Sequence, residues 1–170
     1  MSNYNCSGDV TPTPKPTVLP SFLTYKTGSN VKLVHKAEYC KSIIADGEEL
    51  ITGKESGELV VPELKDGNVY ITFKEDLTSL ANAFYGCSAL TTIPENLFAN
   101  CPKVTDFSYT FYNCTAVTGE SPYTMIGDKK VHLYERKNYP EHFTETTNRR
   151  GCFNGCTGLS DYAQIPSSWK

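Results

Sequence analysis

The sequence lacks any concentrated run of lysine or arginine and any long apolar run. Its formal net charge is −3, with 16 basic and 19 acidic side chains. A protein that binds the nucleic-acid backbone needs a concentrated basic face, so we expect no nucleic-acid partner. No apolar stretch approaches the roughly 20 residues of a transmembrane helix, so we expect no transmembrane segment. The N-terminus also lacks the basic and apolar succession of a secretory signal.

Motifs for catalysis and for cofactor binding are missing as well. The sequence contains no glycine-rich phosphate loop, nucleophile elbow or paired-histidine motif. The three histidines are scattered, and only Cys152 and Cys156 form a close pair of cysteines. Structural zinc sites use paired ligands about two to four residues apart. We therefore expect no metal, no cofactor and no catalytic residue, and we predict that the protein is not an enzyme.

Cysteine, by contrast, is abundant, with seven residues, and it recurs in one pattern. Apolar residues separated by 3, 4, 3 and 3 positions occur twice, and the second set lies 27 residues after the first. The two sets are Leu77, Leu80, Phe84, Cys87, Leu90 and Val104, Phe107, Phe111, Cys114, Val117. A half-unit between them carries Phe98 and Cys101. A fixed period of this length is typical of stacked repeats.

A third, longer unit follows in the segment GCFNGCTGL, with Phe153, Cys156 and Leu159. Phe153 lies 42 residues after Phe111, which is 15 more than the period. YPEHF resembles the earlier IPENLF, so the extra residues are expected within an insertion at about 119–138. In this unit Thr146 occupies the place of a half-unit cysteine.

The recurring cysteines have two explanations, chemistry or packing. A nucleophilic cysteine needs a base and an electropositive setting, and repeating it in a packing register has no chemical purpose. Equivalent side chains of stacked units point in parallel, which disfavours disulfides between them. We therefore predict buried free thiols that act as small apolar residues. A disulfide between Cys152 and Cys156, or one that uses Cys40, is the alternative.

Two other regions precede the repeats. Residues 1–20 have prolines at four positions among Thr and Lys and are predicted to be a flexible tether. Cys6 in this tether is either a lipid-attachment cysteine or an incidental thiol. Residues 21–76 contain short β-branched runs separated by glycine turns, which predicts a β-rich N-terminal cap. Residues 77–170 then form the repeat region.

The stretch FYGCSALTTIPENLFANCPKVTDFSYTFYNCTAV resembles the BspA-like leucine-rich repeats of bacterial surface proteins. CFNGCTGLSDYAQIPSSWK is similar to the closing segment of such proteins. The resemblance implies an α+β right-handed leucine-rich-repeat solenoid, with one short strand and one short helix per coil. It also implies an extracellular or cell-surface location, with a signal peptide that the chain does not carry. It transfers no catalytic residue.

The sequence therefore predicts a monomeric binding or adhesion module that recognises an extracellular protein or glycan. Candidate contact residues lie near the second unit and in the insertion: Tyr109, Tyr112, Tyr123, His132, Tyr134 and Arg136. The alternative for each tyrosine is half-buried packing. Two other functions are a structural spacer or capping domain of a surface assembly, and a carbohydrate-active enzyme with two carboxylates across one groove.

Overall fold

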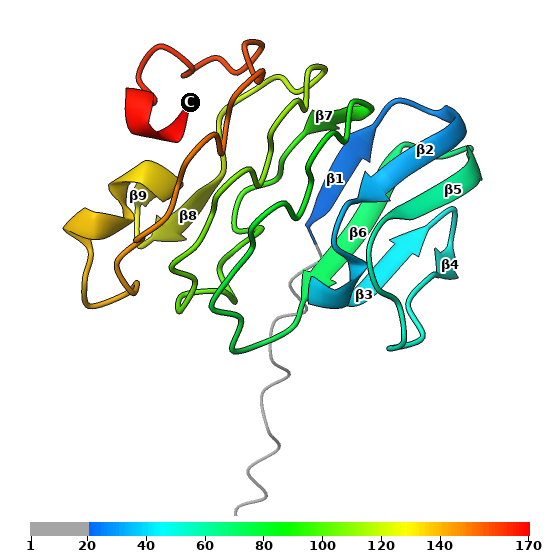
Figure 1. The fold of residues 1–170 in the computed structure, drawn as a ribbon, viewed down its shortest axis with the longest axis horizontal. Helices are drawn as coiled ribbons and strands as arrows, with labels where there is room; N and C mark the ends of the chain where they lie inside the picture. The colour runs from blue at the N-terminus through cyan, green and yellow to red at the C-terminus, as the bar shows by residue number, and fades with distance from the viewer. Residues whose placement is uncertain (1–20) are drawn as a thin grey trace, which may run out of the picture.

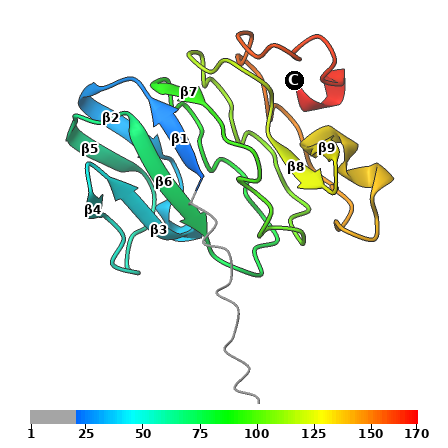
Figure 2. The same ribbon diagram turned by 180° about the vertical axis from the view of Figure 1, so that it is seen from behind.

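The computed structural model of the chain describes residues 21–170. The predicted tether 1–20, with Cys6, lies outside the described residues. Figure 1 shows the N-terminal strands at one end of the molecule and the last residues of the chain at the other, with stacked loops between them. Figure 2 shows the same arrangement from behind.

Antiparallel sheets make up most of the regular structure in residues 21–170. One sheet has five strands in the order β4-β3-β6-β1-β7, and β2 pairs with β5 in a second sheet. A short 3₁₀ turn, η1 (Ala37–Tyr39), precedes β3. The strands are β1 (Phe22–Tyr25), β2 (Gly28–Val34), β3 (Cys40–Ala45), β4 (Glu48–Glu49), β5 (Leu59–Leu64), β6 (Asn68–Phe73) and β7 (Leu90–Thr92). In β6 the buried residues alternate with more exposed ones, as expected for a strand with one face on the core.

Three loops follow β6 and lie side by side; residues 79–90, 106–117 and 148–159 are called the coil segments below. Every second backbone N–H of one coil segment donates to a carbonyl of the next. The four bonds from the first to the second are 2.7 to 2.9 Å long and join Leu80 to Asp106, Asn82 to Ser108, Phe84 to Thr110 and Gly86 to Tyr112. Four equivalent bonds join the second to the third, from Phe107, Tyr109, Phe111 and Asn113.

The predicted fold class is wrong, because the coil segments contain no α-helix and hardly any strand. Their parallel contacts are isolated bridges, such as Ser79 with Asp106, and the extended strands of the described residues pair antiparallel. The spacing of three residues reflects consecutive tight turns, in which Ala83 donates to Leu80 and Cys87 donates to Phe84. Such three-residue bonds are of the 3₁₀ kind.

Left-handed residues explain why these turns do not merge into a helix. Two positions of each coil segment, four residues apart, have positive φ: Asn82 and Gly86, Tyr109 and Asn113, Gly151 and Gly155. A left-handed residue ends a right-handed helix, because only the right-handed region allows continued α-helical bonding for L-residues. The periodicity of apolar residues is therefore real, but its cause is a series of turns.

The core is one continuous cluster that extends from the sheets through the coil segments. Phe84, Phe98, Phe111 and Phe153, the recurring phenylalanines of the repeat, are all buried. Phe111 stacks on Phe84 with ring centroids 5.1 Å apart and on Phe153 at 5.8 Å. Trp169, at the end of the 3₁₀ turn η3 (Ser167–Trp169), stacks on Phe153 and covers the last coil segment. Offset and parallel ring contacts of this kind add to the burial of apolar area.

The cysteines of the coil segments are buried and free, as predicted. Three of these thiols each donate to a carbonyl of the preceding layer: Cys87 to Leu33, Cys114 to Phe84 and Cys156 to Phe111. Cys152 and Cys156 do not form a disulfide. A cysteine therefore fills a narrow space and also supplies a donor to a buried oxygen, which an alanine could not do.

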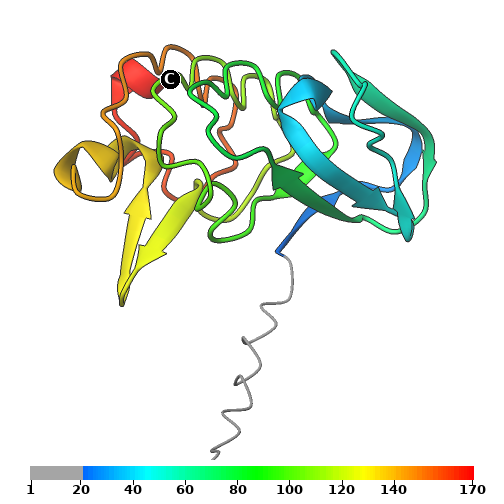
Figure 3. The same cartoon turned by 90° about the horizontal axis from the view of Figure 1, so that it is seen from below.

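The insertion forms a β-hairpin and a 3₁₀ helix. The hairpin consists of β8 (Tyr123–Ile126) and β9 (Lys129–His132), and η2 (Leu133–Asn138) follows directly. Gly127 in the two-residue turn has φ of 57°, a conformation that suits the turns of short hairpins. Figure 3 shows the hairpin projecting away from the coil segments. Within residues 21–170, no helix has the length and apolar character that crossing a bilayer requires.

Candidate functional site

The candidate site is a row of partly exposed aromatic rings along the edge of the coil segments. Tyr85 and Tyr112 stack with centroids 5.0 Å apart and planes 9° from parallel. Tyr109 meets Tyr112 edge to face at 5.6 Å. His35, just beyond β2, lies against Tyr85 at 5.3 Å. These four residues are called the tyrosine row.

The repeat accounts for the stack of Tyr85 on Tyr112. The two residues are 27 positions apart, and each directly follows a phenylalanine of the buried column. Because Phe84 and Phe111 are held in register by backbone bonds, the next side chain in each segment points outward at the same level. Stacked rings lose little conformational entropy on binding, since a tyrosine has only two side-chain torsions.

Tyr109 has an unfavourable backbone conformation for a large side chain. Its φ is 55°, in the left-handed region. The equivalent positions of the other coil segments hold Asn82 and Gly151, the residue types that adopt this region most readily. A left-handed conformation of a residue other than glycine costs about 1–2 kcal/mol. Local strain of this kind concentrates at functional sites, and it directs attention to what the Tyr109 ring does.

Gly151 makes room for the rings. A Cβ atom at this glycine would lie 2.9 Å from Cδ1 of Tyr109 and 3.6 Å from Cδ2 of Tyr112. Contacts under about 3 Å force atoms to shift. The third coil segment therefore has a glycine where the second has Tyr109, and it has Asn154 where the second has Tyr112, so the row of rings does not continue into it.

Polar groups lie beside the Tyr85 end of the row. His35 Nδ1 is 2.9 Å from Oε1 of Glu58, and Lys32 Nζ is 3.1 Å from the same oxygen. Among the hydrogen bonds of residues 21–170, none involves the phenol oxygen of Tyr85, Tyr109 or Tyr112. These hydroxyls can therefore donate to or accept from another molecule.

Three other predicted site residues gather at the hairpin, around His132. The His132 ring stacks on Tyr134 at 5.2 Å and meets Tyr123 edge to face at 5.6 Å. Its Nδ1 is 2.9 Å from Oε2 of Glu135, and its Nε2 is 3.6 Å from Oδ2 of Asp161. The His132 backbone N–H donates to the same Glu135 carboxylate, which closes a capping box at the start of η2.

Asp161 ties this cluster to the C-terminal part of the chain. It accepts bonds from the backbone N–H and the hydroxyl of Ser121, at 2.9 and 2.6 Å, and from the Tyr134 hydroxyl at 3.3 Å. Burial, together with the charge of Asp161, raises the pKa of Tyr134. The rings of this cluster contact one another, and within residues 21–170 the buried Nε2 of His132 has no hydrogen-bond partner.

The prediction that Arg136 is a contact residue is wrong. Its side chain is only 1% exposed. Nη1 donates to the carbonyl of Cys101 at 3.0 Å and Nη2 to that of Phe98 at 3.1 Å. The guanidinium also lies over the rings of Phe107 and Phe143, 5.2 and 4.3 Å from their centroids. Arg136 therefore anchors η2 to the half-unit, and burial lowers its pKa to about 10.

The thiols have the properties of packing residues. Burial raises the pKa of Cys87 and of Cys156 to about 12 and that of Cys101 to about 11. A thiolate is the reactive form of cysteine, so these side chains are poor nucleophiles and poor metal ligands at neutral pH. Among residues 21–170, no three His, Cys, Asp or Glu side chains are grouped so that they could hold a metal ion.

Sequence reasoning identified part of the tyrosine row. Tyr109 and Tyr112 were predicted contact residues, and the structure brings their rings together. Tyr85 was missed, although its offset of 27 residues from Tyr112 was visible in FYGC and FYNC. His35 was missed too, because only the folded chain brings the end of β2 beside Tyr85. The hairpin residues form a separate cluster, and none of its ring contacts includes a tyrosine of the row.

Comparisons with known proteins give no match: no protein-family description, curated protein or solved structure is significantly similar to this chain.

Proposed function

We propose that the chain is a non-enzymatic binding module that uses the tyrosine row to contact an extracellular protein. The observation that carries the proposal is the left-handed backbone conformation of Tyr109, whose ring contacts Tyr112. Asparagine or glycine would fit its left-handed backbone with less strain, yet the chain has a tyrosine whose ring extends the stack of Tyr85 and Tyr112. A large side chain held in an unfavourable backbone conformation is typical of functional sites.

The chemistry of the row favours a protein partner. Stacking covers the faces of Tyr85 and Tyr112, so the row presents ring edges and phenol hydroxyls rather than open ring faces. Tyrosine is enriched at protein interfaces because it combines apolar contact area with a hydroxyl that can pair. The neighbouring Lys32, His35 and Glu58 provide the polar rim that such surfaces have. The extracellular location rests on the resemblance of the repeat phrase to bacterial surface proteins.

An array that carries both extracellular host-protein fragments and glycans tests the proposal. We expect retention of one or more protein fragments, and we expect Tyr112→Ala to reduce it about tenfold or more, as truncation of a central interface tyrosine often does. Tyr70→Ala, which removes a partly exposed tyrosine on β6, is the matched control and should leave retention unchanged.

Tyr109→Asn sharpens the test. Asparagine relieves the backbone strain, so the variant should be as stable as the parent or more stable, by up to about 1 kcal/mol. It should nevertheless bind the fragment more weakly. Loss of binding together with unchanged or increased stability cannot result from unfolding. Retention of glycans alone, or full binding by both tyrosine variants, would contradict the proposal.

A further inference from the structure

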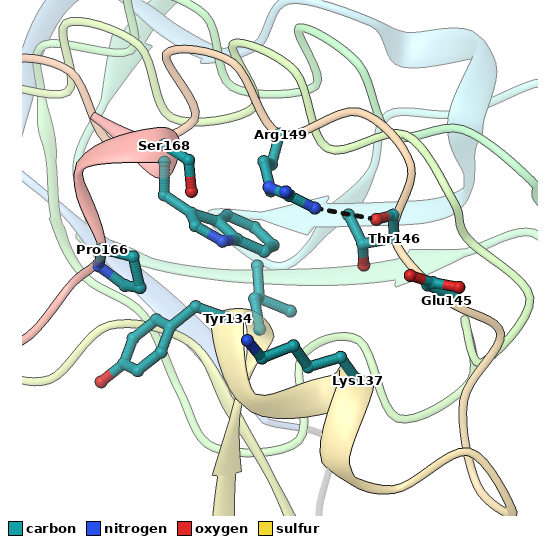
Figure 4. A pocket seen from close by; sticks show the side chains of 9 residues that line it. Tyr134, Lys137, Glu145, Thr146, Arg149, Pro166 and Ser168 are labelled. Atoms are coloured by element: carbon teal, nitrogen blue, oxygen red, sulfur yellow. Dashed lines mark hydrogen bonds between the residues drawn. The ribbon is translucent and has the colours of Figure 1, made fainter.

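A recess lies beside Trp169, the residue that covers the last coil segment. Its volume is about 310 Å³, which is at the lower end of the range for small-molecule sites. Three chain segments form its walls: η2, residues 145–149, and Pro166 with the adjoining η3. Figure 4 shows these residues, and the recess is lined by Leu133, Tyr134, Lys137, Glu145, Thr146, Arg149, Pro166, Ser168 and Trp169.

Two cations face this recess without a carboxylate partner. Lys137 comes from η2 and Arg149 from the segment before the third coil segment, and Figure 4 shows them entering from two sides. Among residues 21–170, neither takes part in an ion pair. Arg149 Nη1 donates to the backbone carbonyl of Thr146 at 3.1 Å, which fixes the position of its guanidinium. Two like charges that share one recess repel each other, and an anion between them relieves that repulsion.

The other lining residues are mixed: Leu133, Tyr134, Pro166 and Trp169 are apolar or aromatic, whereas Glu145, Thr146 and Ser168 are polar. Figure 4 shows Tyr134 and Pro166 on one side of the recess and Glu145 on the side away from them, and Trp169 also lines the recess. The lining thus has two cations against one carboxylate, with rings beside the cations. Such a combination suits a compact ring that carries one acidic group, because the ring can lie against the aromatic wall while the acid pairs with the cations.

We propose that this recess binds a small monocarboxylate whose carboxylate is attached to a compact ring. Lys137 and Arg149 hold the carboxylate, and Tyr134 and Trp169 contact the ring. The site does not depend on the tyrosine row, so either site can exist without the other. A hydroxylated ring, as in a uronic acid, and an apolar ring, as in benzoate, offer the same acidic chemistry.

Trp169 provides a direct readout, because it is the chain's only tryptophan and it lines the recess. Its fluorescence can be titrated with glucuronate, benzoate, glucose and inorganic phosphate. We expect a saturable change with glucuronate or benzoate, and the stronger of the two identifies the kind of ring. We expect no comparable change with glucose, which lacks the acid, or with phosphate, which lacks the ring.

Charge variants assign the binding to the recess. Lys137→Gln and Arg149→Gln should each weaken carboxylate binding roughly tenfold or more, because a hydrogen bond to a charged group is lost. Lys137 is exposed, so its variant should fold normally even if Arg149→Gln does not. Lys129→Gln, which removes one positive charge near the hairpin turn, is the matched control and should change nothing. Glu145→Gln should strengthen binding by about two- to threefold, as expected for loss of an exposed like charge.

The possible results either support or contradict the proposed carboxylate site. Saturable carboxylate binding that weakens in Lys137→Gln but not in Lys129→Gln or Tyr112→Ala supports the proposal. Absence of a saturable signal, equal responses to glucose and glucuronate, a response to phosphate alone, or unchanged binding in Lys137→Gln would each overturn it. Because Tyr112→Ala affects only the tyrosine row, failure here leaves the proposed protein-binding function standing, and the reverse also holds.

Discussion

In the strand region, residues 22–73, backbone groups pair along antiparallel ladders, whereas the coil segments use a mixed scheme. There every second N–H donates to the next segment, and others close three-residue turns. In both regions each buried backbone N–H needs a hydrogen-bond acceptor, because an unpaired buried polar group costs free energy. The comparison shows that a chain can stack in register without regular strands or helices, provided that left-handed residues recur at fixed positions.

The two regions also fill their interiors differently. The sheets bury alternating side chains of several types, whereas the coil segments bury a column of phenylalanine rings beside a column of thiols. A column of identical residues concentrates stability in a few side chains that each contact two neighbours. We therefore expect substitutions in the column to have larger effects than substitutions elsewhere.

The largest effect is expected for Phe111→Ala. Phe111 is fully buried and contacts the rings of Phe84, Phe98 and Phe153. Its loss should lower the free energy of unfolding by about 3–5 kcal/mol. Urea unfolding measures this change, with Val60→Ala at an exposed strand position as the control. A change no larger than that of the control would show that the column does not hold the coil segments together.

The second largest effect is expected for Arg136→Ala, which should lower the free energy of unfolding by about 2–4 kcal/mol. The variant leaves a cavity between Phe107 and Phe143 and removes two charge-assisted bonds to carbonyls. Arg136→Met retains most of the volume and should recover part of the loss. Thermal unfolding of the three proteins separates packing from hydrogen bonding. Equal stability of Arg136→Ala and the parent would mean that the hairpin does not depend on this anchor.

The buried thiols should make the free energy of unfolding depend on pH in the same way in both regions. Burial raises the pKa of Cys87 in a coil segment, and of Cys40 in β3, from 9.0 to about 12. The folded state thus favours the neutral thiol, so its contribution is complete below pH 9 and disappears as the pH rises toward 12. Each thiol should reduce the free energy of unfolding by up to about 1.4 kcal/mol per pH unit in that window.

Cys87→Ala and Cys40→Ala test this dependence in the two regions. Each variant should show a shallower decline of stability between pH 9 and 11 than the parent, by the contribution of one thiol. The measurement is urea unfolding at a series of pH values. An identical decline in parent and variants would mean that the thiols titrate normally in the folded protein.

The smallest effect is expected at two threonines. The hydroxyl of Thr146 is buried, and within residues 21–170 it has no hydrogen-bond partner. Thr146→Val should therefore raise the free energy of unfolding by about 1 kcal/mol. Thr110→Val should lower it by a similar amount, because that hydroxyl donates to Phe107 at 2.7 Å or to Leu80 at 3.0 Å. Changes of the same sign at both positions would contradict this assignment.

The sequence was informative about packing and less so about secondary structure. Burial of the four phenylalanines and the free state of the thiols followed from a repeat of apolar residues, because packing depth depends on side-chain type and register. The helix prediction failed because a spacing of three residues is shared by helices and by consecutive turns. The positive φ of Asn82 and Tyr109 distinguishes the two, and tyrosine gives no sequence signal for it.

The candidate site was likewise predictable from the sequence only in part. The offset between Tyr85 and Tyr112 lies in the sequence and could have placed both rings on one edge. The approach of His35 to Tyr85 depends on a contact between residues 50 positions apart, and that of Lys137 and Arg149 to one recess depends on how the chain folds back between them. Arg136 looked like a surface residue because charged side chains seldom lie inside a protein. Its two carbonyl partners are a product of the tertiary structure alone.

The buried thiols of the coil segments can also be used to measure how often each segment opens. A reagent that alkylates cysteine can reach Cys87, Cys114 or Cys156 only after the layer around it opens. The labelling rate of each residue therefore gives the frequency of opening at one level of the stack. Three rates from one protein, resolved by mass spectrometry, would show whether the molecule opens from the Trp169 end, from the sheet end or everywhere at once.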